Sequence, residues 1–223
     1  MESIKEALER SPKFTLAQKI YEEPELSVAQ KRAASLKYRG VTDLNNTFDK
    51  MRHPKGFEPT YKAFKELADG APWYMLLVYG GTGNGKSKCC EALVIALDDR
   101  NIYAGRTRWS DRVRHLKSLM GGKHQTGEPD YETYFNQMRK SNILILDDVG
   151  SGSTGGAWEW GELEDIIDYR LEHKLMTVVT TNLDGKDIPP RIISRFKDTA
   201  RARMVFNTAA DQRPLEVSNV STG

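Results

Sequence analysis

The sequence predicts an α/β fold in which a mostly parallel, five-stranded sheet is covered by helices on both faces. Two observations lead to this prediction. From residue 74 onward, short apolar runs typical of buried strands alternate with segments of helical spacing. One apolar run also passes through a glycine-rich loop directly into a helix, as in the strand–loop–helix units of parallel sheets. We therefore expect three layers, with the sheet between two layers of helices.

Composition fits one such domain with a short extension, because the chain has 223 residues, 39% apolar and 29% charged. No run approaches the ~20 consecutive apolar residues of a membrane span. The acidic N-terminus lacks the apolar segment of a signal peptide. The two adjacent cysteines, Cys89 and Cys90, are poorly placed to bridge each other or to chelate a metal, and they suit a reduced environment. We expect a cytoplasmic protein with no membrane partner.

We divide the chain into a helical N-terminal extension over residues 1–45, an α/β domain over 46–214 and a flexible tail over 215–223. The extension carries short amphipathic patterns, and its second helix is expected from Ser27 to Tyr38. A turn-rich stretch follows, and then a helix marked by Tyr61, Phe64 and Leu67, which Asp69-Gly70 ends. The expected strands are Tyr74–Tyr79, Ile102–Arg106, Ile143–Asp147, Thr177–Thr181 and Arg203–Asn207. The expected helices are Lys86–Leu97, Ser110–Met120, Tyr131–Lys140, Trp160–His173 and Pro189–Phe196.

Residues 80–87 form a complete G-x-x-x-x-G-K-[ST] phosphate loop between the first expected strand and its helix. Glycines let backbone N–H groups turn toward phosphates, and the helix N-terminus adds partial positive charge. A lysine supplies a full charge, and a serine hydroxyl is a Mg²⁺ ligand. The sequence thus predicts ATP and Mg²⁺ as cofactors. The predicted nucleotide-binding residues are Gly80, Gly81, Thr82, Gly83, Asn84, Gly85, Lys86, Ser87 and, on the helix, Cys89.

Polar residues that end two later strands complete the predicted site. The apolar run from Ile143 ends in Asp147 and Asp148. We expect Asp147 to hold Mg²⁺ through water beside Ser87, and Asp148 to orient or deprotonate the attacking water. The next strand leads to Asn182, which could reach that water or simply serve as a turn or cap residue.

Two arginines four residues apart, Arg191 and Arg195, lie on the helix expected beyond Asn182. This position suggests an arginine finger, a guanidinium inserted into a neighbouring subunit's site to stabilise charge during phosphoryl transfer. A surface salt bridge is the alternative for either residue.

A basic segment lies between the second strand and the acid pair, with six Arg or Lys residues and one acid between Arg106 and Lys123. Guanidinium groups pair with phosphates and an aromatic ring can stack on a base, so the segment could bind single-stranded DNA. A solvated basic face with the tryptophan buried is the alternative. The predicted DNA-binding residues are Arg106, Arg108, Trp109, Arg112, Arg114 and Lys117.

This ordered set resembles the AAA+ ATPases and, more closely, the helicase-loader branch around DnaC and DnaI, with the transposition protein IstB in a sister group. The resemblance covers about Phe48 to Arg213 and includes the segment Trp158 to Arg170. It implies the P-loop AAA+ fold, Asn182 as a sensor of the γ-phosphate and Arg195 as the finger. It also implies that the basic segment contacts single-stranded DNA in a helical assembly. We expect no helical lid after Phe206.

The resemblance implies an ATPase that oligomerises in the ATP state, binds single-stranded DNA and loads or regulates a replicative helicase, with hydrolysis of ATP to ADP and phosphate stimulated by DNA and assembly. Lys86, Asp147, Asp148, Asn182 and Arg195 are its expected catalytic residues. One alternative is an IstB-like transposition ATPase acting on double-stranded DNA, which the core motifs do not separate from a loader. A small-molecule P-loop kinase and a nucleotide-dependent adaptor with little turnover are further alternatives.

Overall fold

The computed structural model describes residues 26–121, 127–151 and 156–213. The chain divides into two compact units, Met1–Ser35 and Leu36–Gly223. The described part of the first unit contains the start of helix α3 (Val28–Tyr38), where the Ser27 Oγ accepts a hydrogen bond from the Gln30 N–H (3.2 Å). The patterns expected before residue 26 and the tail from residue 215 lie outside the described residues.

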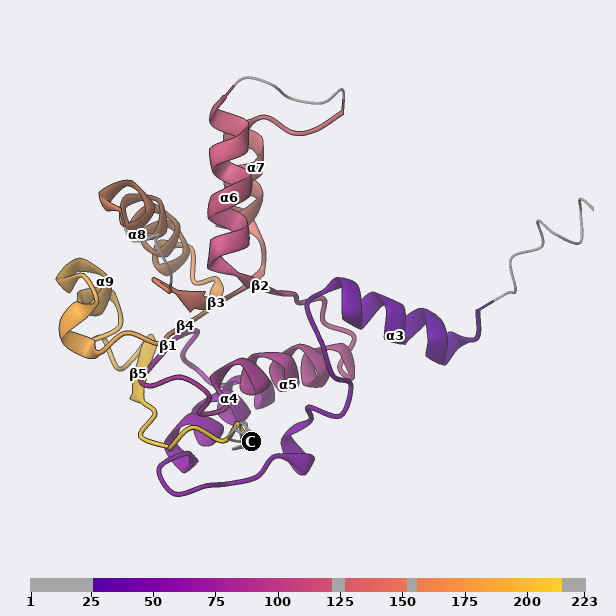
Figure 1. The fold of residues 1–223 in the computed structure, drawn as a ribbon. Helices are drawn as coiled ribbons and strands as arrows, with labels where there is room; N and C mark the ends of the chain where they lie inside the picture. Colours follow the sequence, from indigo (N-terminus) through magenta and orange to yellow (C-terminus); the bar gives the residue numbers. More distant parts are fainter. Residues whose placement is uncertain (1–25, 122–126, 152–155, 214–223) are drawn as a thin grey trace, which may run out of the picture. The chain divides into compact units, whose positions relative to one another are not determined.

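The second unit contains a five-stranded sheet in the order β2-β3-β4-β1-β5, and every neighbouring pair of strands is parallel (Figure 1). The sheet confirms the predicted α/β fold. Its strands are β1 (Met75–Tyr79), β2 (Arg106–Arg108), β3 (Ile143–Val149), β4 (Met176–Thr181) and β5 (Ala202–Phe206). The central strands are nearly continuous apolar runs because helices cover both faces of the sheet.

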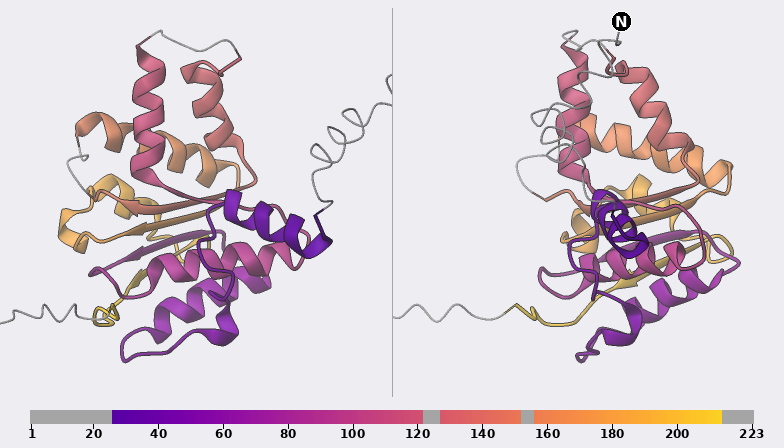
Figure 2. Two further views of the ribbon diagram at one scale, coloured as in Figure 1. Left: turned by 45° about the vertical axis from the view of Figure 1, so that its right-hand side comes forward. Right: turned by 90° about the vertical axis from the view of Figure 1, so that its right-hand side faces the viewer.

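The helices of the second unit lie in two layers, one on each side of the sheet (Figures 1 and 2). On one side are α4 (Glu58–Asp69) and α5 (Lys86–Asp98). On the other side are α6 (Trp109–Met120), α7 (Tyr131–Lys140), α8 (Ala157–Glu172) and α9 (Pro190–Arg195). Two short 3₁₀ turns, η1 (Phe48–Lys50) and η2 (Gly185–Asp187), lie in the connections. The predicted order of elements is confirmed.

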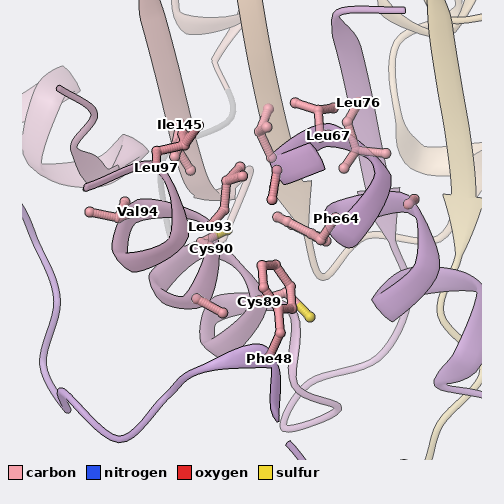
Figure 3. Packing of buried hydrophobic residues seen from close by; sticks show 14 of the residues in the cluster. Phe48, Phe64, Leu67, Leu76, Cys89, Cys90, Leu93, Val94, Leu97 and Ile145 are labelled. Atoms are coloured by element: carbon pink, nitrogen blue, oxygen red, sulfur yellow. The ribbon is translucent and has the colours of Figure 1, made fainter. Parts of the chain in front are cut away.

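Each face of the sheet has its own hydrophobic core. Leu76 and Val78 of β1 pack with Phe64 of α4 and with Leu93 of α5, as Figure 3 shows for part of this cluster. Met75 and Leu77, the alternate residues of the same strand, pack with the helices of the opposite layer. This division follows from the two-residue period of a strand, which sends successive side chains to opposite faces.

The structure differs from the sequence prediction at the second strand, which is formed by Arg106–Arg108 and not by Ile102–Arg106. The Ile102 N–H instead donates to the Leu97 carbonyl (2.9 Å), and Asn101 has a φ of +58°. This bond satisfies a carbonyl at the end of α5, so the residues after it close the helix and do not extend the strand.

The second unit begins at Leu36, ahead of the residue 45 at which we placed the end of the extension. Leu36 and Val41 are buried in the same core as Phe48, which ties this stretch to the α/β unit. No helix in the described part of the chain is long and apolar enough to span a membrane.

Candidate nucleotide-binding site

The phosphate loop connects the carboxyl end of β1 to the first turn of α5. Gly83 and Gly85 have φ values of +65° and +92°, in the left-handed region that glycine adopts without strain. A Cβ on Gly85 would also lie 2.8 Å from the ring of Phe57. The motif therefore needs glycine at this position for both its backbone conformation and its packing.

Lys86 begins α5 and directs its ammonium back into the loop. Its Nζ donates to the carbonyls of Gly80 (2.7 Å) and Gly81 (2.6 Å) and to the Asn84 Oδ1 (3.0 Å). Burial lowers the pKa of Lys86 to about 8, although the charges of Asp147 and Asp148 oppose this shift. Lys86 thus holds an ammonium group close to the loop, and this group loses its proton around pH 8.

A cavity of about 700 Å³ opens beside the loop, a volume in the range of small-molecule sites. The loop contributes residues 82–88, and the ends of β3 and β4 contribute Asp148 and Asn182. The remaining wall comes from two segments that the sequence analysis did not assign to the site, namely Asn45, Asn46, Lys50, Met51, Arg52, Pro54, Phe57, Gln212 and Arg213.

The C-terminal part of the described chain is joined to the loop by hydrogen bonds. The Gln212 N–H donates to the Gly83 carbonyl (2.9 Å), and Arg213 Nη2 donates to the Thr82 hydroxyl (3.0 Å). Asn207 exchanges bonds with Asn84 in both directions, at 3.3 and 3.0 Å. These contacts make the segment after β5 part of the cavity wall.

Cys89, which we expected among the nucleotide-binding residues, is fully buried in the core beneath the loop. Its Sγ lies 3.9 Å from the Met51 sulfur, and it does not line the cavity. Burial raises the pKa of the Cys89 thiol far above its ordinary value, so the thiol is neutral. This geometry supports a packing role for Cys89.

The two acids that end the apolar part of β3 have different surroundings. Asp147 is 1% exposed, does not line the cavity, and accepts hydrogen bonds from Arg106 Nε (2.9 Å), Arg106 Nη2 (2.6 Å) and the Thr180 hydroxyl. Asp148 does line the cavity and accepts a hydrogen bond from the Asn182 side-chain amide. Its φ of +60° is uncommon for a residue other than glycine. The cavity therefore receives Asp148 and not Asp147.

The residues at the cavity suit a hydrated Mg²⁺ that is bound together with phosphates. Mg²⁺ keeps several waters and uses one or two carboxylates plus substrate oxygens. The Ser87 hydroxyl and the Asp148 carboxylate line the same cavity and are oxygen donors of this kind. Among the described residues, no group of three or more His, Cys, Asp or Glu side chains could hold a metal ion. A direct Mg²⁺ contact by Asp147, in contrast, would compete with its arginine.

Two of the predicted DNA-binding residues are corrected by the structure. Trp109 is 2% exposed and packs in the core with Val113 and Leu116, so its ring is covered and cannot stack on a base. Arg106 pairs with two buried acids, Asp147 and Glu91. Burial lowers the pKa of Arg106, but Asp147 and, to a smaller extent, Cys90 and Glu91 together raise it above its ordinary value, so the guanidinium remains charged beside these acids.

The other predicted DNA-binding residues, Arg108, Arg112, Arg114 and Lys117, retain solvent-accessible surface. Arg114 lies 3.3 Å from Asp111, and Lys117 lies 2.7 Å from Glu159. Arg112 donates to the Tyr134 hydroxyl. Within the described ranges, Arg108 forms no ion pair.

Both candidate finger arginines of α9 pair with acids of α8. Arg195 donates to both carboxylate oxygens of Asp168, with Nη2 at 2.8 Å from Oδ2, and Arg191 lies 3.6 Å from Glu164. Neither lines the cavity of its own chain. The structure thus brings Lys86, Ser87, Asp148 and Asn182 together and leaves the arginines outside.

Several solved structures of other proteins share the fold of this chain. No protein-family model matches the chain. The structure of the DnaC helicase loader matches with a TM-score of 0.59 and 20% identity, over 74% of this chain and 97% of that one. DnaI matches with a TM-score of 0.58 and 20% identity, over 75% of this chain and 90% of that one. The replication initiator DnaA bound to AMPPCP and single-stranded DNA matches with a TM-score of 0.61 and 18% identity, over 74% of this chain.

The chain covers 50% of the length of each AMPPCP-bound DnaA chain that it matches. At these identities the likeness concerns the fold alone, which this chain shares with DnaA, DnaC and DnaI. The predicted resemblance to the DnaC/DnaI branch is confirmed at that level.

Proposed function

We propose that this chain is an ATP-hydrolysing AAA+ protein of DNA replication that loads or regulates a replicative helicase. The observation that carries the proposal is the cavity at the carboxyl end of the sheet, where Lys86, Ser87, Asp148 and Asn182 meet. A fold shared with the DnaC helicase loader supports the assignment to replication.

Each residue at the cavity has a role in this proposal. Lys86 turns its ammonium from the loop carbonyls to the nucleotide phosphates, and the Ser87 hydroxyl would be a ligand of Mg²⁺. The ion supplies charge stabilisation to the β- and γ-phosphates when bound. Asp148 accepts hydrogen bonds from the attacking water, and the Asn182 amide fixes the orientation of that carboxylate.

The site requires a cation from a second copy of the chain. Arg195 and Arg191 do not line their own cavity and are paired with acids of α8 on the protein surface. In an ATP-dependent homo-oligomer, Arg195 leaves Asp168 and enters the neighbour's cavity, where its charge stabilises phosphoryl transfer. A monomer therefore hydrolyses ATP slowly.

The partner nucleic acid is single-stranded DNA, bound by the exposed basic residues of β2 and α6. Arg108 ends β2, Arg114 and Lys117 lie on α6, and all three supply charge for phosphate contacts. The match to DnaA in complex with single-stranded DNA supports this choice of strand. Trp109 and Arg106 contribute to folding and not to the contact.

Fluorescence anisotropy with matched single- and double-stranded oligonucleotides, in ATP and in ADP, tests the proposal. We expect ATP-dependent binding to the single strand, and at least about tenfold weaker binding for Arg108→Gln/Arg114→Gln. The control Lys62→Gln/Lys65→Gln removes two charges from α4, on the opposite face of the sheet, and is expected to bind as the wild type does.

Other outcomes would contradict parts of the proposal. A preference for duplex DNA would favour the IstB-like transposition ATPase. Absence of binding to either strand would reopen the kinase and adaptor alternatives, and counting the phosphate released per subunit would separate an ATPase from an adaptor. We expect Lys86→Ala to lose nucleotide binding or ATP turnover. Unchanged activity in this variant would overturn the whole assignment.

A further inference from the structure

Arg106 is the centre of a buried polar cluster that lies behind the cavity. It belongs to the edge strand β2, where its backbone N–H donates to the Arg39 carbonyl (2.8 Å). Its guanidinium donates twice to Asp147 Oδ2, from Nε (2.9 Å) and Nη2 (2.6 Å). The Nη1 atom donates to Glu91 Oε1 (3.2 Å) and to the Gly40 carbonyl (3.0 Å). One cation therefore holds two acids from different elements.

The second acid of the cluster joins it to the wall of the cavity. Glu91, on α5, is 3% exposed and accepts from the Thr42 hydroxyl (2.7 Å), the Asp43 N–H (3.2 Å) and the Asn46 side-chain amide (2.9 Å). Asn46 itself lines the cavity. These bonds hold Glu91 in place beside Arg106, so the guanidinium has little freedom to leave Asp147.

The same contacts determine what Asp147 offers to a cation. Its Oδ2 is occupied by Arg106 and its Oδ1 by the Thr180 hydroxyl. A buried carboxylate whose charge is matched by a guanidinium has a weakened field outside the pair. The one carboxylate that remains for a cation at the cavity is Asp148, beside the Ser87 hydroxyl, and Mg²⁺ in such sites takes its further ligands from substrate phosphates.

We infer that Arg106 is a positioning residue that withholds Asp147 from divalent cations, so that a cation enters the cavity only together with the nucleotide phosphates. This inference rests on the proposed nucleotide function for the cavity but concerns the protein without nucleotide. A purely structural role for Arg106 predicts loss of stability on substitution and no change in metal binding. The inference predicts a gain of metal binding.

Electron paramagnetic resonance of Mn²⁺ measures this directly, because the signal of the free hydrated ion decreases when the ion binds. The full chain is titrated with Mn²⁺ and no nucleotide, as wild type, Arg106→Gln and the control Arg201→Gln, which removes a charge from an exposed pair with Asp198. We expect Arg106→Gln to bind Mn²⁺ at least about tenfold more tightly than the wild type and the control. Adding Asp147→Asn to Arg106→Gln should abolish the gain.

Equal Mn²⁺ affinity in the wild type and a folded Arg106→Gln protein would overturn the inference, as would a gain that survives Asp147→Asn. If Arg106→Gln does not fold, Arg106→Lys carries the test. Lysine keeps the positive charge but cannot form both hydrogen bonds to Asp147, so we expect a smaller gain in Mn²⁺ affinity. No gain in Mn²⁺ affinity would count against the inference. Binding of a fluorescent ATP analogue to the wild type is measured separately. Its failure would overturn the proposed function without changing the result for Mn²⁺ alone.

Discussion

The buried ammonium of Lys86 makes nucleotide binding sensitive to pH in a range that an ordinary lysine does not reach. Desolvation lowers the pKa of Lys86 to about 8, from a usual value of 10.5. Only the protonated form carries the charge that the phosphates require. Raising the pH through 8 therefore removes the binding-competent form of the free protein.

The magnitude follows from this pKa. The charged fraction is about nine-tenths at pH 7, half at pH 8 and one-tenth at pH 9, so the apparent Kd for ATP should rise about tenfold between pH 7 and pH 9. A lysine at its ordinary pKa would change the Kd by only about 3% over the same interval. The two cases are easily separated by titration with a fluorescent ATP analogue at constant ionic strength.

A matched variant and a stability measurement isolate the cause. Lys86→Arg keeps a charge that does not titrate in this range, so its affinity should be independent of pH between 7 and 9. The unfolded chain binds the Lys86 proton more tightly than the folded protein does, so this group makes the unliganded protein more stable as pH rises from 8 to 10.5. Deprotonation of Lys86 therefore does not destabilise the fold, and unfolding caused by it cannot explain weaker ATP binding at pH 9. A flat wild-type profile, or an equal fall in Lys86→Arg, would refute the reasoning.

Three further substitutions test other parts of the structure. Arg170→Met should lower the free energy of unfolding in urea by about 3 kcal/mol, because fully buried Arg170 donates to the carbonyls of Met138, Ser141 and Met176; a loss below 1 kcal/mol would contradict this role. Trp109→Phe should leave single-stranded DNA binding unchanged in anisotropy, since the ring is in the core; weaker binding by a stably folded variant would restore the stacking role. Arg195→Ala should retain ATP affinity and lose most DNA-stimulated phosphate release. If the stimulation is retained, Arg195 is not the arginine finger and Arg191 is the next candidate.

The local features of the fold could be predicted because they depend on contiguous residues. Strands β1, β3 and β4 are short apolar runs, and the phosphate loop is a motif with its own strand and helix. Strand β2 was placed wrongly because its residues, Arg106–Arg108, are polar and its pairing with Ile145, Leu146 and Asp147 depends on a strand far away in the chain. The burial of Trp109 did have a sequence signal, since Trp109, Val113 and Leu116 share one helical face.

Much of the candidate site could not be predicted, because it is assembled from distant segments without a motif. The wall formed by residues 45–57 is a turn-rich stretch whose pattern shows no ligand chemistry. The contact of Arg106 with Asp147 joins residues 41 positions apart, on adjacent strands that are parallel. Sequence spacing predicted that two acids end β3, but which acid faces the cavity depends on the backbone, where Asp148 has a positive φ.

The positions of the two acids account for the choice of residues around them. A buried Asp147 without a partner would be costly, so a full charge must accompany it, and the edge strand supplies Arg106. That arginine also needs its remaining N–H groups satisfied, and Glu91 and the Gly40 carbonyl accept from them. Glu91 in turn accepts from the segment that forms the cavity wall. Residues 40–46 carry no recognisable motif, but they supply the hydrogen bonds that hold Glu91 and Arg106 in place. These two residues in turn neutralise Asp147, so Asp148 is the carboxylate that faces the nucleotide cavity.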